Sequence, residues 1–151
     1  GWLLAAWPAG TVLAAPVAGR LIGRMPSGLL GGIGLGLMAF GLLALALLPA
    51  HPSGAALAWR LAVCGVGFGL FQSPNNHTIV TSAPLHRSGA ASGMLGTARL
   101  TGQTLGAVML AGIFSIFPAH DGGGERTALA AAAAFAVLAA VSSSLRLRRA
   151  H

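Results

Sequence analysis

The sequence has little charge, two acidic residues, one cysteine, and neither lysine nor tyrosine. Only 7% of its 151 residues are charged, against about 25% in soluble domains, so an ordinary water-exposed surface is hard to build. Cys64 is alone, which excludes a disulfide framework and a thiolate metal site. No residues stand at paired metal-ligand spacing, and no Ser, His and acid constellation suggests hydrolysis. We therefore expect no metal, no cofactor and no enzyme activity.

Basic residues outnumber acidic ones by nine to two, and the nine are all Arg. An excess of this kind is also found in nucleic-acid-binding domains. Here the Arg residues stand singly or in small groups between long uncharged runs, and no basic stripe is interleaved with aromatic residues. This pattern does not favour nucleic acid, and it is typical of Arg at the cytoplasmic ends of membrane helices.

Long apolar blocks dominate the chain. A helix rises about 1.5 Å per residue, so about 20 residues cross the roughly 30 Å of hydrocarbon in a bilayer. Charges and turn residues divide the chain into five blocks of about this length or more. We expect an all-α polytopic membrane bundle that occupies residues 1–151, with transmembrane helices at residues 1–19, 28–48, 55–80, 89–117 and 127–145.

The Arg residues also predict an orientation. Five spans place alternate connections on opposite sides of the membrane, and the positive-inside rule makes the Arg-rich side cytoplasmic. The first residues are then outside and the C-terminus is cytoplasmic, in a multi-pass protein of the cell membrane, the inner membrane of a bacterium. The outer side receives Arg126, Arg60, which snorkels to the interface, and a loop with Asp121 and Glu125. The cytoplasmic side receives Arg20, Arg24, Arg87, Arg146, Arg148 and Arg149.

Polar side chains inside the third and fourth blocks are the candidate site. Charged and amide groups are expensive in hydrocarbon, so they usually face a protein interior or a wet cavity. Arg99 lies roughly 15 Å into the bilayer. It either lines a substrate cavity or an inter-bundle contact, or bonds backbone carbonyls and holds the bundle together. Gln103, one turn further, shares that face or makes an interhelical hydrogen bond. Gln72 is the deepest amide of the third block and the better placed for substrate.

Two further groups are predicted to be structural or to act in gating. Pro74 interrupts the third block, and Asn75 and Asn76 beside it are able to satisfy the carbonyls that the proline leaves free. The second group is the turn after the first block, Gly19, Arg20, Gly23 and Arg24. This turn either latches an inner gate or anchors helix ends to anionic headgroups.

Two stretches carry a resemblance to a known family. The first, PVAGRLIGRMPSGLLGGIGL, is similar to the cytoplasmic loop signature G-x-L-x-D-R-x-G-R of the major facilitator superfamily: Gly19, Leu21 and Arg24 fit, while Gly23 stands in place of Asp and Pro26 in place of Gly. The second, GFGLFQSPNNHTIVTSAPLHRSGAASGMLGTARLTGQTLG, is the more specific match. Over its whole length the chain resembles the drug:proton antiporters of the fourteen-helix type.

The resemblance implies the last five helices of a C-terminal six-helix bundle and transport by alternating access. In that family, inward proton flow drives export of hydrophobic or cationic compounds. The implied partners are the missing N-terminal helices, the lipid bilayer, a small-molecule substrate and protons. The acidic residue usually credited with proton coupling belongs to the N-terminal half, and this sequence has no intramembrane carboxylate.

Two alternatives remain beside a transporter. Gly1 lies inside an apolar run with no initiating Met and no basic region before it, so we expect the chain to be a fragment of a longer protein. As a fragment, it is either part of a working transporter or a truncated, non-transporting membrane piece or helical scaffold. A membrane-embedded enzyme is disfavoured, because no catalytic carboxylates or metal ligands are present.

Overall fold

The computed structural model describes residues 2–49, 51–117 and 123–145. Within them lie a one-turn 3-10 helix, η1 (Leu85–Arg87), and five α-helices: α1 (Trp2–Leu21), α2 (Ser27–Ala46), α3 (Gly54–Thr81), α4 (Ser88–Ile116) and α5 (Gly123–Leu145). Each α-helix overlaps one of the five expected blocks. Four residues to which the sequence analysis gave a place lie outside the described residues: Asp121, Arg146, Arg148 and Arg149.

The helices form an all-α membrane bundle. Among the described residues, α2, α3 and α5 are each long and apolar enough to cross a membrane. Large apolar side chains also face outward on the surface, such as Phe40 at 58% and Leu138 at 62% exposure, as lipid contact requires. Arg99 and Gln103 in the middle of α4 lower its apolar character, and the crossing of the membrane by α1 and α4 stays a prediction.

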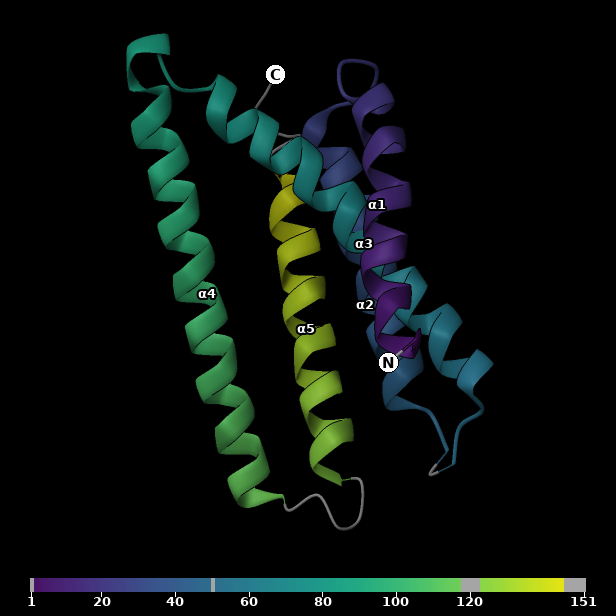
Figure 1. Cartoon of the computed structure of the whole chain (residues 1–151). Coiled ribbons are helices and arrows are strands. Elements are labelled where there is room, and N and C mark those ends of the chain that lie inside the picture. Colours follow the sequence, from purple (N-terminus) through teal and green to yellow (C-terminus); the bar gives the residue numbers. More distant parts are fainter. Residues whose placement is uncertain (1, 50, 118–122, 146–151) are drawn as a thin grey trace.

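Successive connections lie at opposite ends of the bundle (Figure 1). The turn from α1 to α2, η1 and the C-terminal end of α5 are at the same end of the bundle. Arg20 and Arg24, at that turn, and Arg87 in η1 are therefore at this end. Arg126 is in the first turns of α5, at the other end, where it donates to the carbonyl oxygen of Leu48 at 3.2 Å. This arrangement is the alternation on which the predicted orientation depends.

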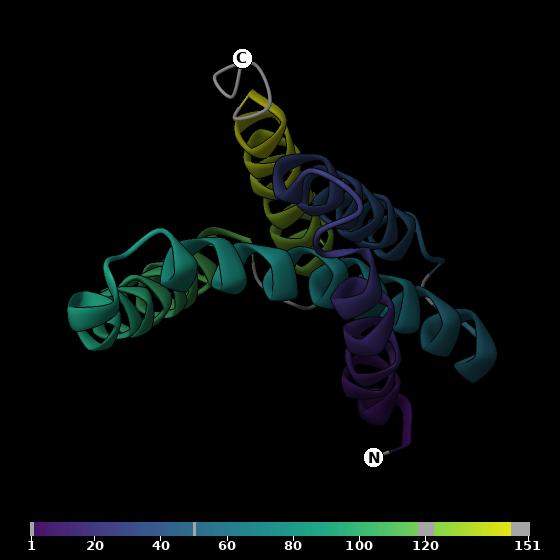
Figure 2. The ribbon, with the colours of Figure 1, turned by 90° about the horizontal axis from the view of Figure 1, so that it is seen from above.

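The best-packed part of the structure is α3 with its neighbours. Viewed from above, α3 crosses between α1 on one side and α2 with α5 on the other (Figure 2). Glycines make this packing close: a Cβ on Gly65 would overlap the Trp7 carbonyl oxygen of α1, and one on Gly67 would lie 2.6 Å from the Gly34 carbonyl oxygen of α2. The buried core beside them contains Ala39, Leu42, Leu45, Cys64, Ala133 and Ala136.

α4 stands apart from this packed group (Figures 1 and 2). None of its residues is buried, and a Cβ added at Gly96 or Gly106 would meet nothing within 4 Å. Its glycines therefore have no close helix partner among the described residues, in contrast to those of α3. The separation leaves a space between the first half of α4 and α3, which is the candidate site.

Candidate functional site

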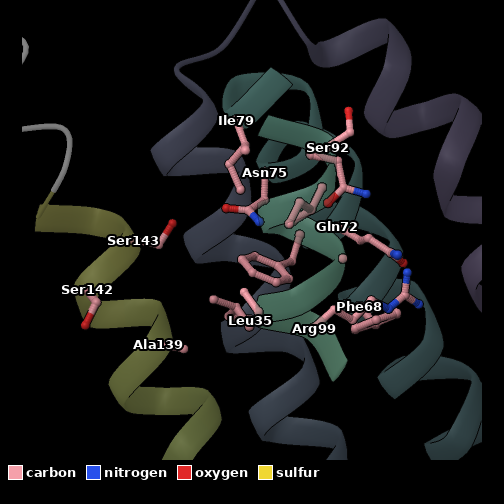
Figure 3. Close-up of a pocket in the computed structure, with 15 residues that line it drawn as sticks. Leu35, Phe68, Gln72, Asn75, Ile79, Ser92, Arg99, Ala139, Ser142 and Ser143 are labelled. Carbon is pink, nitrogen blue, oxygen red and sulfur yellow. The ribbon is translucent and has the colours of Figure 1, made fainter. Parts of the chain in front are cut away.

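A cavity of about 590 Å³ lies between α2, α3, α4 and α5 (Figure 3). Ligand pockets in proteins measure about 300–1,000 Å³, so this volume suits a small organic molecule. The lining combines aromatic and aliphatic side chains with amides, hydroxyls and one guanidinium. It consists of Leu35, Phe68, Phe71, Gln72, Asn75, Asn76, Ile79, Ser92, Leu95, Gly96, Ala98, Arg99, Ala139, Ser142 and Ser143.

The largest wall is one face of α3. Phe68, Gln72, Asn75 and Ile79 follow one another at spacings of four, three and four residues, and Phe71 precedes Asn75 by four, which places all five on the same side of a helix. Along this wall the two aromatic rings come first and the amides follow them toward the C-terminal end of α3. Gln72 extends toward the opposite wall in Figure 3, and its residue is partly buried.

The facing wall is the first half of α4. Arg99 follows Ser92 by seven residues, two helical turns, and lies roughly 17 Å along the axis from the start of α4 at Ser88. The side-chain ends of Arg99 and Gln72 point toward one another in Figure 3, and both line the cavity. Within the described residues, the side-chain hydrogen bonds of α4 are made by hydroxyls alone, Ser88, Ser92, Thr97, Thr104 and Ser115, so the Arg99 guanidinium is unpaired there.

Gln103 does not line this cavity. It lies between two segments of α4. The segment from Ser92 to Arg99 lines the cavity, and the segment from Gly106 to Ile113 faces α5 across a separate apolar cavity of about 240 Å³. The structure therefore brings Arg99 and Gln72 together and leaves Gln103 outside.

The segment around Pro74, for which the sequence predicted a structural or gating role, also supplies residues that line the cavity. Pro74 is fully buried inside a continuous α3, and its carbonyl oxygen accepts from the Thr78 hydroxyl at 2.8 Å. Asn75 and Asn76 line the cavity. Neither amide appears in a hydrogen bond among the described residues, so both have free donors and acceptors for a ligand or for water.

The other predicted gating residues are Gly19 and Arg20 in the last turn of α1 and Gly23 and Arg24 in the turn that follows it, and none of the four lines the cavity. Gly23 has φ +90°, a backbone conformation that suits glycine. The Leu21 carbonyl oxygen accepts from the Arg24 amide at 3.0 Å and closes the turn. Glycine in place of the signature's Asp therefore has a local reason. Arg20 and Arg24 are exposed, as either predicted role requires.

Several lining residues were missed by sequence reasoning. Phe68 and Phe71 carry a signal, because their spacing to Gln72 and Asn75 puts them on the same helix face. Ser143 of α5 is another omission: its hydroxyl donates to the Gly28 carbonyl oxygen of α2 at 3.2 Å. The run Ser142 to Ser144 in an otherwise Ala- and Leu-rich helix is the signal there. Among the described residues, no group of three His, Cys, Asp or Glu side chains is placed to hold a metal.

Three curated proteins are similar to the chain. It is 54% identical over 147 residues, 97% of its length, to the uncharacterized transporter YebQ of Escherichia coli, and covers 32% of that protein. It is 30% identical over 115 residues, 76% of its length, both to the multidrug resistance protein Stp of Mycobacterium tuberculosis and to the riboflavin transporter RibZ of Clostridioides difficile. It covers 21% of the former and 25% of the latter.

The chain therefore spans about a third or less of the relatives it matches. No protein-family model matches it, and no solved structure does. Two of the three relatives are named as transporters, and the third is named for multidrug resistance. Together with the membrane-spanning helices, these matches show a multi-pass membrane chain that is similar to transporters.

Proposed function

We propose that the chain is the C-terminal part of a secondary active transporter that exports small, largely hydrophobic compounds by alternating access, driven by protons. The observation that carries the proposal is the cavity between α3 and α4. It is large enough for a drug-sized molecule, and it lies among helices long enough to cross a bilayer. The relatives named for multidrug resistance and for riboflavin transport support a small organic substrate.

The substrate contacts that we propose are Arg99 and Gln72. Both side chains are in the middle of their helices, where an unpaired polar group is costly in lipid and is retained in a solvated or ligand-filled cavity. Asn75 and Asn76 stand one turn nearer the end that holds Gly23 and the Arg-rich turns, so we assign them to the inner entrance of the cavity. The same end of the bundle faces the cytoplasm in this proposal.

We also propose that helices outside these residues complete the transporter. α4 has no buried residue. The curated relatives of the chain are at least three times as long as the part of them that the chain matches. None of the described residues that line the cavity is a carboxylate, so in this proposal the proton-carrying acid belongs to those helices. We use the term complete transporter for the chain together with them.

The test is efflux of a fluorescent substrate from cells that express the complete transporter. Arg99→Leu is expected to abolish efflux while the amount of protein in the membrane stays normal. Gln72→Leu is expected to reduce efflux about tenfold, because a lost hydrogen bond to a charged or buried polar partner costs about 1.5 kcal/mol. Gln103→Leu, one turn from Arg99 but outside the cavity, is the matched control, with efflux within twofold of wild type.

Unchanged efflux in Arg99→Leu would remove this residue from the site. Proton coupling has its own measurement, since an uncoupler that collapses the proton gradient should stop efflux in the wild type. The rival hypothesis, a non-transporting fragment or scaffold, predicts that no variant and no uncoupler changes dye retention, because no efflux depends on these residues.

A further inference from the structure

The described residues that line the cavity carry a positive charge and no negative charge. Arg99 is the only ionisable side chain among its lining residues, and the other polar groups there are amides and hydroxyls. Of the two acidic residues in the sequence, Glu125 is in the first turn of α5, near the opposite end of that helix from the lining residues Ser142 and Ser143. Asp121 lies outside the described residues. Within the described structure, the positive charge of Arg99 is therefore not balanced by a carboxylate.

The donors of the cavity converge on one area. The Arg99 guanidinium carries five N–H donors and no acceptor, and the Gln72 amide points toward it (Figure 3). Guanidinium matches the geometry of a carboxylate or a similar anion with two parallel hydrogen bonds. An anionic group at this place would be bound by Arg99 and would accept a further hydrogen bond from Gln72.

The rest of the cavity is suited to a flat apolar body. Phe68 and Phe71 belong to the wall of α3 and Leu35 to that of α2. Aromatic side chains stack on flat rings or meet them edge to face. Asn75 and Asn76, further along the same wall, offer both donors and acceptors to heteroatoms at the edge of such a ring.

We propose that this cavity selects planar aromatic compounds that carry an anionic group, with the anion held by Arg99 and Gln72 and the rings against Phe68 and Phe71. The inference rests on the proposed export function and specifies its substrate class. It departs from the cationic compounds implied by the family resemblance, because a cation in this cavity would be repelled by the like charge of Arg99.

Two dyes that share a three-ring xanthene body make the test direct. At mildly alkaline pH fluorescein is an anion, whereas rhodamine 123 is a cation. Binding of each dye to the complete transporter in lipid nanodiscs is measured by fluorescence anisotropy. We expect fluorescein to bind at least about tenfold more tightly than rhodamine 123, because charge-assisted hydrogen bonds are about twice as strong as neutral ones and like charges repel.

Variants assign the preference to Arg99. Arg99→Gln should bring the two dissociation constants to within about threefold of each other, Arg99→Lys should retain part of the preference, and Arg99→Glu should reverse it. Arg60→Gln is the matched control, since Arg60 is also an arginine of a spanning helix but does not line the cavity. It should leave the preference intact. Monodisperse elution of each nanodisc preparation verifies that the variants fold.

Tighter binding of rhodamine 123 by the wild type would overturn the inference. So would binding of neither dye, or an anionic preference that survives in Arg99→Gln. Efflux of fluorescein from cells is measured in parallel. Loss of efflux with retained, Arg99-dependent binding would count against the proposed export function and leave the substrate class standing, so the two failures are distinguishable.

Discussion

The Thr11 hydroxyl of α1 donates a hydrogen bond to the Gly65 carbonyl oxygen of α3 at 3.1 Å. The same hydroxyl lies 3.1 Å from the Trp7 carbonyl oxygen one turn earlier in α1. This contact is possible because Gly65 has no side chain, which lets the two backbones approach closely. The wall of α3 that lines the cavity is thus held on its other side by α1.

Gly65→Ala should separate α1 from α3. The new Cβ would overlap the Trp7 carbonyl oxygen and lie 3.2 Å from the Thr11 backbone nitrogen, and neither backbone atom can move aside cheaply. Overpacking of this kind costs about 1–3 kcal/mol, more than the gain of up to about 1 kcal/mol from replacing a helical glycine by alanine. We expect a lower melting temperature for the complete transporter in detergent.

Gly36→Ala is the matched control for that experiment. Gly36 is exposed on α2, and a Cβ there meets nothing within 4 Å, so its melting temperature should equal or exceed that of the wild type. A melting temperature of Gly65→Ala that equals or exceeds that of the wild type, as expected for Gly36→Ala, would show that the gain in helix propensity outweighs any cost at the contact of α1 with α3.

The five helical segments and the alternation of their ends were predictable because both follow from local properties. The length of an apolar block sets whether it spans a bilayer, and the Arg residues of the connections, such as Arg24 and Arg87, mark the end of the bundle at which they lie. The placement of Arg99 and Gln72 on helix faces follows equally from residue spacing. Which residues of two helices reach one cavity depends on tilt and distance between the helices, and residue spacing does not record these.

Gln103 illustrates that limit. It shares a helix face with Arg99, yet only the part of α4 from Ser92 to Arg99 lines the larger cavity, and the part after Gln103 faces α5. The glycines of α2 give a second example. Gly28, Gly32 and Gly36 follow one another at spacings of four residues along α2. Gly28 and Gly32 contact α5, through Ser143 and Ser144, whereas a Cβ on Gly36 meets nothing within 4 Å. Equal spacing along a helix does not imply an equal distance to the neighbouring helix.

Gly23→Ala should strain the turn between α1 and α2. Gly23 has φ +90°, and left-handed backbone costs a residue with a Cβ about 1–2 kcal/mol. We expect a lower melting temperature for Gly23→Ala, and a smaller decrease for Gly23→Asn, because Asn adopts left-handed conformations more readily than Ala. Efflux measured on the same variants tests whether the turn also takes part in gating.

Gly19→Ala provides the comparison for the turn. Gly19 is an exposed residue inside α1, and a Cβ there meets nothing within 4 Å. Its replacement should be neutral or slightly stabilising. A wild-type melting temperature for Gly23→Ala would show that the turn relaxes into another conformation at no cost, and the local reason for glycine at this position would be lost.

The orientation in the membrane is testable with single cysteines. In a Cys64→Ser background, His51→Cys and Ser82→Cys place thiols at exposed positions beyond the two ends of α3. The Arg-rich end, near Ser82, is the predicted cytoplasmic end. A membrane-impermeant maleimide should therefore label His51→Cys in intact cells, and should label Ser82→Cys only after the cells are permeabilised.

The labelling pattern separates three arrangements because the two thiols lie on opposite ends of one helix. Labelling of Ser82→Cys alone in intact cells would invert the orientation and place the Arg-rich turns outside, against the positive-inside rule. Labelling of both would mean that α3 does not cross the membrane. The Cys64→Ser parent, in which this chain has no cysteine, controls for labelling at other sites. α3 is the decisive helix because it supplies the largest wall of the cavity.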